Sequence, residues 1–120
     1  MTANPGAWAE EQALTYLQAH GLALLARNYR CRGGELDLVM EGSGMLVFVE
    51  VRHRASADFG TPEETVTASK QKRLLLAART YLLHHPRHAA RPMRFDVVSL
   101  QGKPPEARIK WIRNAFGADG

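Results

Sequence analysis

Two carboxylates and an arginine lie inside segments of the sequence that otherwise predict buried β-strands. Asp37 lies in GELDLVM, and Glu50 and Arg52 lie in MLVFVEVR, with only EGSG between the two segments. Carboxylate oxygens on rigid strands are the ligands that Mg²⁺ and Mn²⁺ prefer, with water and phosphate completing the coordination. Arginine beside such a pair can bind the negative charge of a phosphate. The segments therefore predict metal-dependent phosphate chemistry, provided that the strands bring the carboxylates together.

The register of the two strands decides whether Asp37 and Glu50 meet. Since side chains alternate along a strand, we predict that Leu36, Leu38 and Met40 lie on one face of the first strand and Glu35, Asp37 and Val39 on the other. On the second strand, we predict that Phe48, Glu50 and Arg52 share a face. A two-residue turn at Ser43–Gly44, or a four-residue loop over 42–45, places Asp37 opposite Glu50. A three-residue turn places Asp37 opposite Val49. The glycine-containing two-residue turn is the one that hairpins prefer.

Facing carboxylates need a compensating charge. With Cβ atoms about 5 Å apart, Asp37 and Glu50 repel one another unless Arg52 or a divalent cation offsets the repulsion. The alternative is purely structural: Glu35 and Arg52 form an exposed cross-strand pair, and Asp37 and Glu50 lie on a hydrated face. The hairpin sequence by itself leaves both interpretations open.

A third carboxylate comes from the first predicted helix. The positions three, four and seven residues after Glu10 are all apolar, whereas those after Glu11 include Thr15 and Gln18. Glu10 is therefore expected beside the buried stripe, and Glu11 towards solvent. We expect Glu10 to lean towards Asp37 and Glu50 as a further ligand or through water. Its structural explanation is that an acid in the first turn favours the helix dipole.

The second predicted helix opens with Lys70, Gln71, Lys72 and Arg73. Cations oppose the dipole at a helix N-terminus, so an anionic ligand there would offset an unfavourable arrangement. The alternative is a solvated basic turn, satisfied by Glu63 and Glu64 just upstream. The net charge of +4 and the pI of about 9.6 are a mild indication of a polyanionic partner.

The whole chain predicts a single α/β domain over residues 1–120, with a frayed tail from about 113. The expected order is α-β-β-β-α-β: a helix from residue 5 to about 20, strands over 22–30, 35–40 and 45–52, a helix over 70–85 capped by Thr67 or Ser69, and a strand over 93–100. Residues 108–112 are expected to form a short edge strand. The crossover helix makes the strand over 93–100 parallel to that over 45–52, which gives a mixed central sheet flanked by helices.

Composition excludes several classes of protein. Cys31 is the single cysteine, so neither an internal disulfide nor a multi-cysteine zinc site can form, and a reducing cytoplasm is expected. No apolar run is long enough to span a membrane, and no signal peptide is visible at the N-terminus.

These motifs together resemble the YraN-like family of predicted endonucleases. The resemblance covers nearly the whole chain, through GAWAEEQALTYL, RNYRCRGGELDLV, VFVEVRHR, FGTPEETVTASKQKRLLLAARTYL, RFDVVSL and WIRNAF. It implies the restriction-endonuclease-like fold of the PD-(D/E)xK superfamily, related in shape to archaeal Holliday junction resolvases. By position it implies a catalytic set with metal ligands, and Glu35 matches the acid of the family's GE(I/L)D. The implied catalytic residues are Glu10, Asp37, Glu50, Arg52, Lys70 and Gln71, and the implied metal ligands are Asp37, Glu50 and Glu10.

Arg52 departs from the superfamily pattern, which has lysine at this position. Arginine keeps its charge and can hold a phosphate, but it does not act as a proton acceptor. The expected activity is a metal-dependent endonuclease, using one or two Mg²⁺ or Mn²⁺ ions on branched or junction-like DNA, DNA being favoured over RNA. The candidates for contacting the nucleic-acid backbone are Arg27, Arg30, Arg54, Lys70, Lys72 and Arg73. A homodimer is expected by analogy alone. The alternatives are a non-catalytic nucleic-acid-binding module and a protein-interaction domain on a nuclease scaffold.

Overall fold

In the part of the chain that the structure describes, five strands form one mixed sheet with a helix on each face. The computed structural model describes residues 5–54 and 66–117. Its elements are α1 (Pro5–Ala19), β1 (Ala23–Cys31), β2 (Gly34–Gly42), β3 (Met45–Arg54), α2 (Ala68–His84), a short 3-10 helix (Pro86–His88), β4 (Met93–Gln101) and β5 (Arg108–Phe116). The strands lie in the order β1-β2-β3-β4-β5. Among the neighbouring strands described, only β3 and β4 are parallel, as expected of strands joined through a crossover helix.

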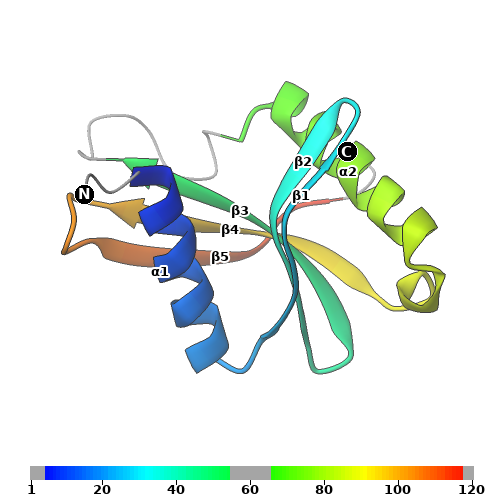
Figure 1. The fold of residues 1–120 in the computed structure, drawn as a ribbon, viewed down its shortest axis with the longest axis horizontal. Coiled ribbons are helices and arrows are strands. Elements are labelled where there is room, and N and C mark those ends of the chain that lie inside the picture. Colours follow the sequence, from blue (N-terminus) through cyan, green and yellow to red (C-terminus); the bar gives the residue numbers. More distant parts are fainter. Residues whose placement is uncertain (1–4, 55–65, 118–120) are drawn as a thin grey trace.

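The first helix covers one face of the sheet. Ala9, Ala13 and Leu17 of α1 are buried against alternate residues of the central strands, among them Val49 and Val98. The helix ends as predicted at glycine: Gly21 has φ 95°, and the amide of the following residue reaches back to the carbonyl of Leu17 at 3.1 Å. This cap turns the chain into β1 and sets the position of α1 over β3 (Figure 1).

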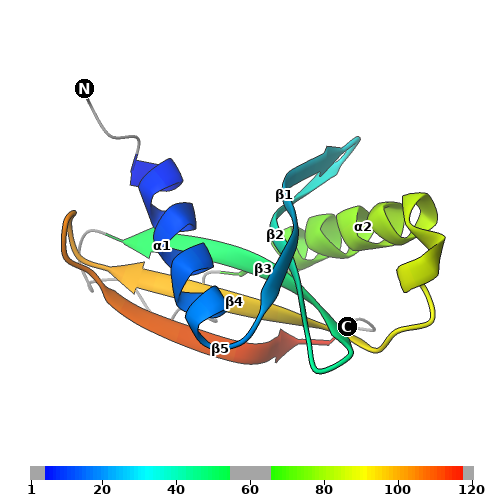
Figure 2. The same cartoon turned by 60° about the horizontal axis from the view of Figure 1, so that its bottom comes forward.

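The second helix covers the opposite face. Of the two predicted caps, Thr67 is the one used, because its side chain accepts a hydrogen bond from the amide of Lys70 at 3.2 Å. Leu74, Ala77 and Tyr81 of α2 are buried in a second core cluster with residues of the sheet such as Phe48. Figure 2 shows α2 along the β1–β2 side of the molecule and α1 along β3 to β5.

The β2–β3 hairpin has the register predicted from the two-residue turn. Gly42 pairs with Met45, and Ser43 and Gly44 between them have φ 53° and 78°. Positive φ at both positions is typical of the turns that join twisted strands. The pairing continues to Leu38 and Val49, and beyond it the strands diverge into a fork (Figures 1 and 2).

The predicted alternation along β2 is wrong at one position. Leu38 belongs to the core beneath α1, whereas Leu36 belongs to the core beneath α2, so the two leucines do not share a face. The neighbouring strand changes conformation at the same level, since Asn28 of β1 has φ 50° and lies between the residues that pair with Leu36 and Leu38. The twist of the β1–β2 ribbon therefore reverses the side-chain order at Asp37.

The predicted frayed tail is also wrong in part, because residues 113–116 belong to β5, which is longer than the predicted edge strand. A bulge in β5 contains Asn114 at φ 52°. The backbone amide of Asn114 donates to the fully buried carboxylate of Asp96 at 2.9 Å.

Among the described helices, none is long and apolar enough to cross a membrane.

Candidate active site in the fork between β2 and β3

Asp37 lies where β2 separates from β3. Its side chain accepts a hydrogen bond from a backbone N–H of β3 that β2 no longer pairs with. The carboxylate oxygen Oδ2 accepts a hydrogen bond from the backbone N–H of Val51 at 2.8 Å. Continuing the register past Leu38–Val49 places Asp37 opposite Glu50. The fork therefore fixes the Asp37 carboxylate on the side that faces β3, as the two-residue turn predicted.

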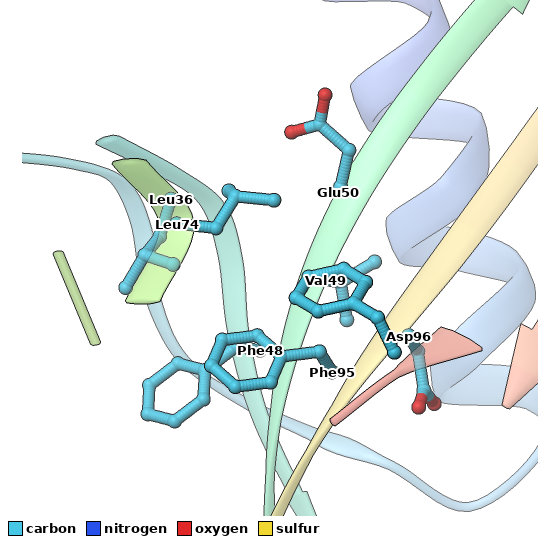
Figure 3. A pocket seen from close by; sticks show the side chains of 8 residues that line it. Leu36, Phe48, Val49, Glu50, Leu74, Phe95 and Asp96 are labelled. Carbon is cyan, nitrogen blue, oxygen red and sulfur yellow. The ribbon is translucent and has the colours of Figure 1, made fainter. Parts of the chain in front are cut away.

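Glu50 is a buried acid with two basic neighbours. It is 4% exposed, and its Oε2 lies 3.1 Å from Nζ of Lys70 and 3.5 Å from a terminal nitrogen of Arg52. Figure 3 shows the Glu50 carboxylate directed away from the packed rings of Phe48 and Phe95. The side chains around that packing leave no room for a water molecule. The site therefore has a dry floor, where charges interact more strongly than in water.

The Asp37 carboxyl is driven towards its neutral form. Burial raises the pKa of Asp37 to about 7, and the charge of Glu50 acts in the same direction. A hydrogen bond between the two carboxyl groups and the charge of Glu10 raise it further, against the lowering effect of the Val51 amide. Lys70 and Arg52 both contact Glu50 and favour its charged form. We therefore assign the proton of this carboxyl pair to Asp37 near neutral pH.

This arrangement predicts a pH-dependent loss of stability that Asp37→Asn removes. An acid whose pKa is raised on folding destabilises the fold once the unfolded chain ionises, so the free energy of unfolding should fall from pH 4 to about pH 7 and then level off. Asparagine still accepts from Val51 and carries no charge. At pH 8 in EDTA we expect the variant to be more stable by on the order of 1 to 2 kcal/mol, since solvent screens this half-buried position.

Urea unfolding at pH 4.5, 6 and 8 measures this difference. Glu41→Gln is the matched control, because Glu41 is a half-buried acid on the same strand that pairs with Arg91 at 2.9 Å, near the hairpin. Parallel curves of stability against pH for wild type and Asp37→Asn would contradict the assigned proton.

Glu10 is placed near this pair but not among its contacts. It is half-buried on α1, which packs on the face of the sheet opposite to α2, and its charge still raises the pKa of Asp37. In the described part of the chain, no three acidic, histidine or cysteine side chains gather closely enough to hold a metal ion. The described residues therefore do not form a close three-carboxylate cluster, and the expected role of Glu10 through water stays a prediction. Glu11 points to Arg27, at 3.0 Å.

Lys70 and Gln71 have different roles at the start of α2. Lys70 contacts Glu50, whereas the side-chain amide of Gln71 donates to the backbone carbonyl of Val66 at 3.0 Å and holds the segment before the helix. Lys72 and Arg73 are exposed in the same turns. Glu63 and Glu64, the predicted partners of this basic turn, lie outside the described residues.

The remaining basic candidates do not form one group with the acids. Arg30 of β1 pairs with Glu35 at 3.6 Å and is largely exposed, and Arg27 is held by Glu11. Arg54 ends β3, and its carbonyl accepts from the amide of Gly102 at 2.8 Å. Of the predicted cations, the structure thus brings only Lys70 and Arg52 to the carboxylate pair.

The donor set of the fork suits a hard divalent cation. Two carboxylates face one another, and Asp37 holds a proton near neutral pH because burial, and after it the charge of Glu50, raises its pKa to about 7. A cation between Asp37 and Glu50 would replace that proton and offset the repulsion between the carboxylates. Solvent and phosphate oxygens would supply the other ligands, since residues 5–54 and 66–117 bring two carboxylates together here.

Sequence reasoning missed two features of this region. The Val51 amide orients Asp37, and only the divergence of the strands leaves that amide for a side chain. The second feature is Asp96, an acid that is completely buried and pairs with Arg94 at 3.0 Å. The sequence signal for its burial was the position of Asp96 between Phe95 and Val97, inside an apolar strand.

Comparisons with known proteins agree on one family. A family model described as uncharacterised protein family UPF0102 matches residues 9–100. The chain is 54% identical over 112 residues to a UPF0102 protein of Pseudomonas putida strain GB-1, covering 92% of this chain and 91% of the relative. It is 48% identical over 123 residues to a UPF0102 protein of Ralstonia pickettii strain 12J, covering 99% and 94%.

Proposed function

The chain belongs to the uncharacterised protein family UPF0102, the YraN-like family whose motifs it carries, and from the site in the fork we propose that it is a metal-dependent endonuclease. The observation that carries the proposal is the facing pair of Asp37 and Glu50, with Asp37 held by the Val51 amide and Glu50 in contact with Lys70 and Arg52. This combines a ligand pair for a hard cation with two cations for a phosphate.

The residues divide the reaction between them. Asp37 and Glu50 would hold Mg²⁺ or Mn²⁺, one ion or two, which when bound supplies an activated water and neutralises charge on the scissile phosphate. Asp37 would serve as an anionic ligand once deprotonated, and the Val51 amide keeps its carboxylate oriented. Lys70 and Arg52, which lie beside Glu50, would stabilise the negative charge that develops on the phosphate. This role does not require Arg52 to accept a proton.

The finer assignment of the fold is part of the same proposal. A mixed sheet whose neighbouring strands separate around an acid pair, with a helix on each face, supports a restriction-endonuclease-like core. We propose DNA with branches or junctions as the substrate, a homodimer as the working unit and the cytoplasm as its location. The +4 net charge supports a polyanionic substrate.

A non-catalytic nucleic-acid-binding module is the second candidate, and one contact favours it. Lys70 at 3.1 Å and Arg52 at 3.5 Å already compensate the charge of Glu50 without a metal. A binding module needs only such a balanced site and a basic surface. The two candidates differ in whether Asp37 gains a divalent cation.

Metal binding and cleavage, measured together, separate these candidates. We expect Mn²⁺ to raise the melting temperature of the wild-type protein in a concentration-dependent way, since the ion binds the native state, and to have little effect on Asp37→Ala. With Mg²⁺, a four-way junction should be cut and EDTA should stop the cutting. Tight DNA binding that weakens with salt, with no metal effect on melting and no cleavage of junction, duplex or single-stranded DNA, would instead establish the binding module.

A further inference from the structure

A second recess lies at the other end of the molecule, between the end of α1, the β2–β3 turn and β5. Its volume is about 320 Å³, close to the lower end of the range of small-ligand sites. The described residues that line it are His20, Gly21, Leu22, Gly42, Ser43, Met45, Arg94, Trp111 and Arg113. They include two arginines and a histidine but no acidic side chain, so the recess suits an anionic group.

The two arginines are held in place by contacts that leave donors for a ligand. Arg94 uses its Nε on both oxygens of buried Asp96, at 3.0 and 3.2 Å, and one terminal nitrogen lies 3.5 Å from the sulfur of Met45. The guanidinium of Arg113 stacks 3.9 Å from the ring centroid of Trp111, and within the described residues it has no carboxylate partner. Fixed guanidinium forks of this kind bind phosphate with little loss of side-chain freedom.

The wall also contains aromatic and apolar side chains. The ring of Trp111 is fixed by its indole N–H, which donates to Asp96 at 2.8 Å, and the His20 ring contacts it edge-on at 5.9 Å. Leu22 and Met45 complete this wall. A bare phosphate ion would use the arginines only, whereas a ligand with a planar ring and a phosphate would use both parts.

We propose that this recess binds a nucleoside phosphate, with its phosphate at Arg94 and Arg113 and its base against the Trp111, Leu22 and Met45 wall. Free nucleotides and the phosphorylated end of a nucleic-acid strand share this chemistry. The recess is on the α1 face, whereas Glu50 is on the α2 face and about 17 Å further along β3, at ~3.3 Å per residue. Binding here therefore does not depend on the proposed nuclease site.

Titration with adenosine monophosphate, followed by the indole N–H signals of the two tryptophans, tests the proposal. We expect the Trp111 signal to shift saturably and the Trp8 signal to stay in place, because Trp8 contacts His53 at the other end of α1. Arg113→Ala should weaken binding at least tenfold, the effect of losing a charge-assisted hydrogen bond. Arg108→Ala, which removes an exposed arginine from the same strand, should change it less than twofold.

Three further ligands identify what the recess recognises. Adenosine and inorganic phosphate should each bind at least tenfold more weakly than the nucleotide. A 5′-phosphorylated oligonucleotide that competes, when its unphosphorylated form does not, assigns the site to strand ends, and failure to compete assigns it to free nucleotides. An unmoved Trp111 signal, equal losses in Arg113→Ala and Arg108→Ala, or equal binding of adenosine and the nucleotide would overturn the proposal.

Discussion

Asp37→Ala should lower metal-dependent DNA cleavage by roughly 10³-fold or more, which corresponds to the several kcal/mol that a bound metal contributes to a transition state. The substitution removes one of two facing ligands and leaves the Val51 amide without its acceptor at 2.8 Å. Single-turnover cleavage of a junction at saturating Mg²⁺ measures the loss. The variant should remain folded, because it also removes an acid whose pKa burial and the charge of Glu50 raise to about 7.

The control for this loss is Glu41→Ala, which removes an acid from the same strand at the hairpin end. It breaks a contact with Arg91 and leaves the fork intact, so cleavage should stay within about threefold of wild type if surface ion pairs have their usual small effect. If Asp37→Ala cuts the junction as fast as Glu41→Ala does, the activity resides elsewhere in the preparation or the chain. A DNA-binding assay on both variants separates lost chemistry from lost affinity.

Asp96→Ala should destabilise the protein by about 3 to 5 kcal/mol, the usual effect of removing one partner from a buried charge pair. The Asp96 carboxylate is completely buried and accepts from Arg94, from the Trp111 indole and from the Asn114 amide. Without it, a largely buried guanidinium and two N–H groups lose their acceptor, and the bulge of β5 loses its anchor. Urea unfolding followed by far-UV circular dichroism measures the change.

Glu106→Ala provides the comparison, since Glu106 is an exposed acid in the connection between β4 and β5. Its loss should change stability by less than about 0.5 kcal/mol. Asp96→Asn should lie between the two, because one amide oxygen can still serve the indole or the backbone amide but no longer carries the charge that pairs with Arg94. A stability of Asp96→Ala equal to that of Glu106→Ala would mean that β5 is not held to the sheet through this carboxylate.

The sequence predicted the local elements well because their signals are local. Gly21 ends α1 through its positive φ, Thr67 caps α2, and Ser43–Gly44 selects a two-residue turn that places Asp37 opposite Glu50. Each of these depends on a few neighbouring residues. The mixed sheet followed from the length of the crossover between β3 and β4.

The tertiary structure decided the placement of side chains that depends on the twist of the strands and on the face of the sheet that each helix covers. The twist of β1 and β2 moved Leu36 to the other core and opened the fork that lets the Val51 amide hold Asp37. The side of the sheet chosen by α1 kept Glu10 out of contact with the acid pair, and the bulge in β5 buried Asp96. Side-chain spacing along one strand carries no information about these long-range placements, since they are set by the packing of two cores at once.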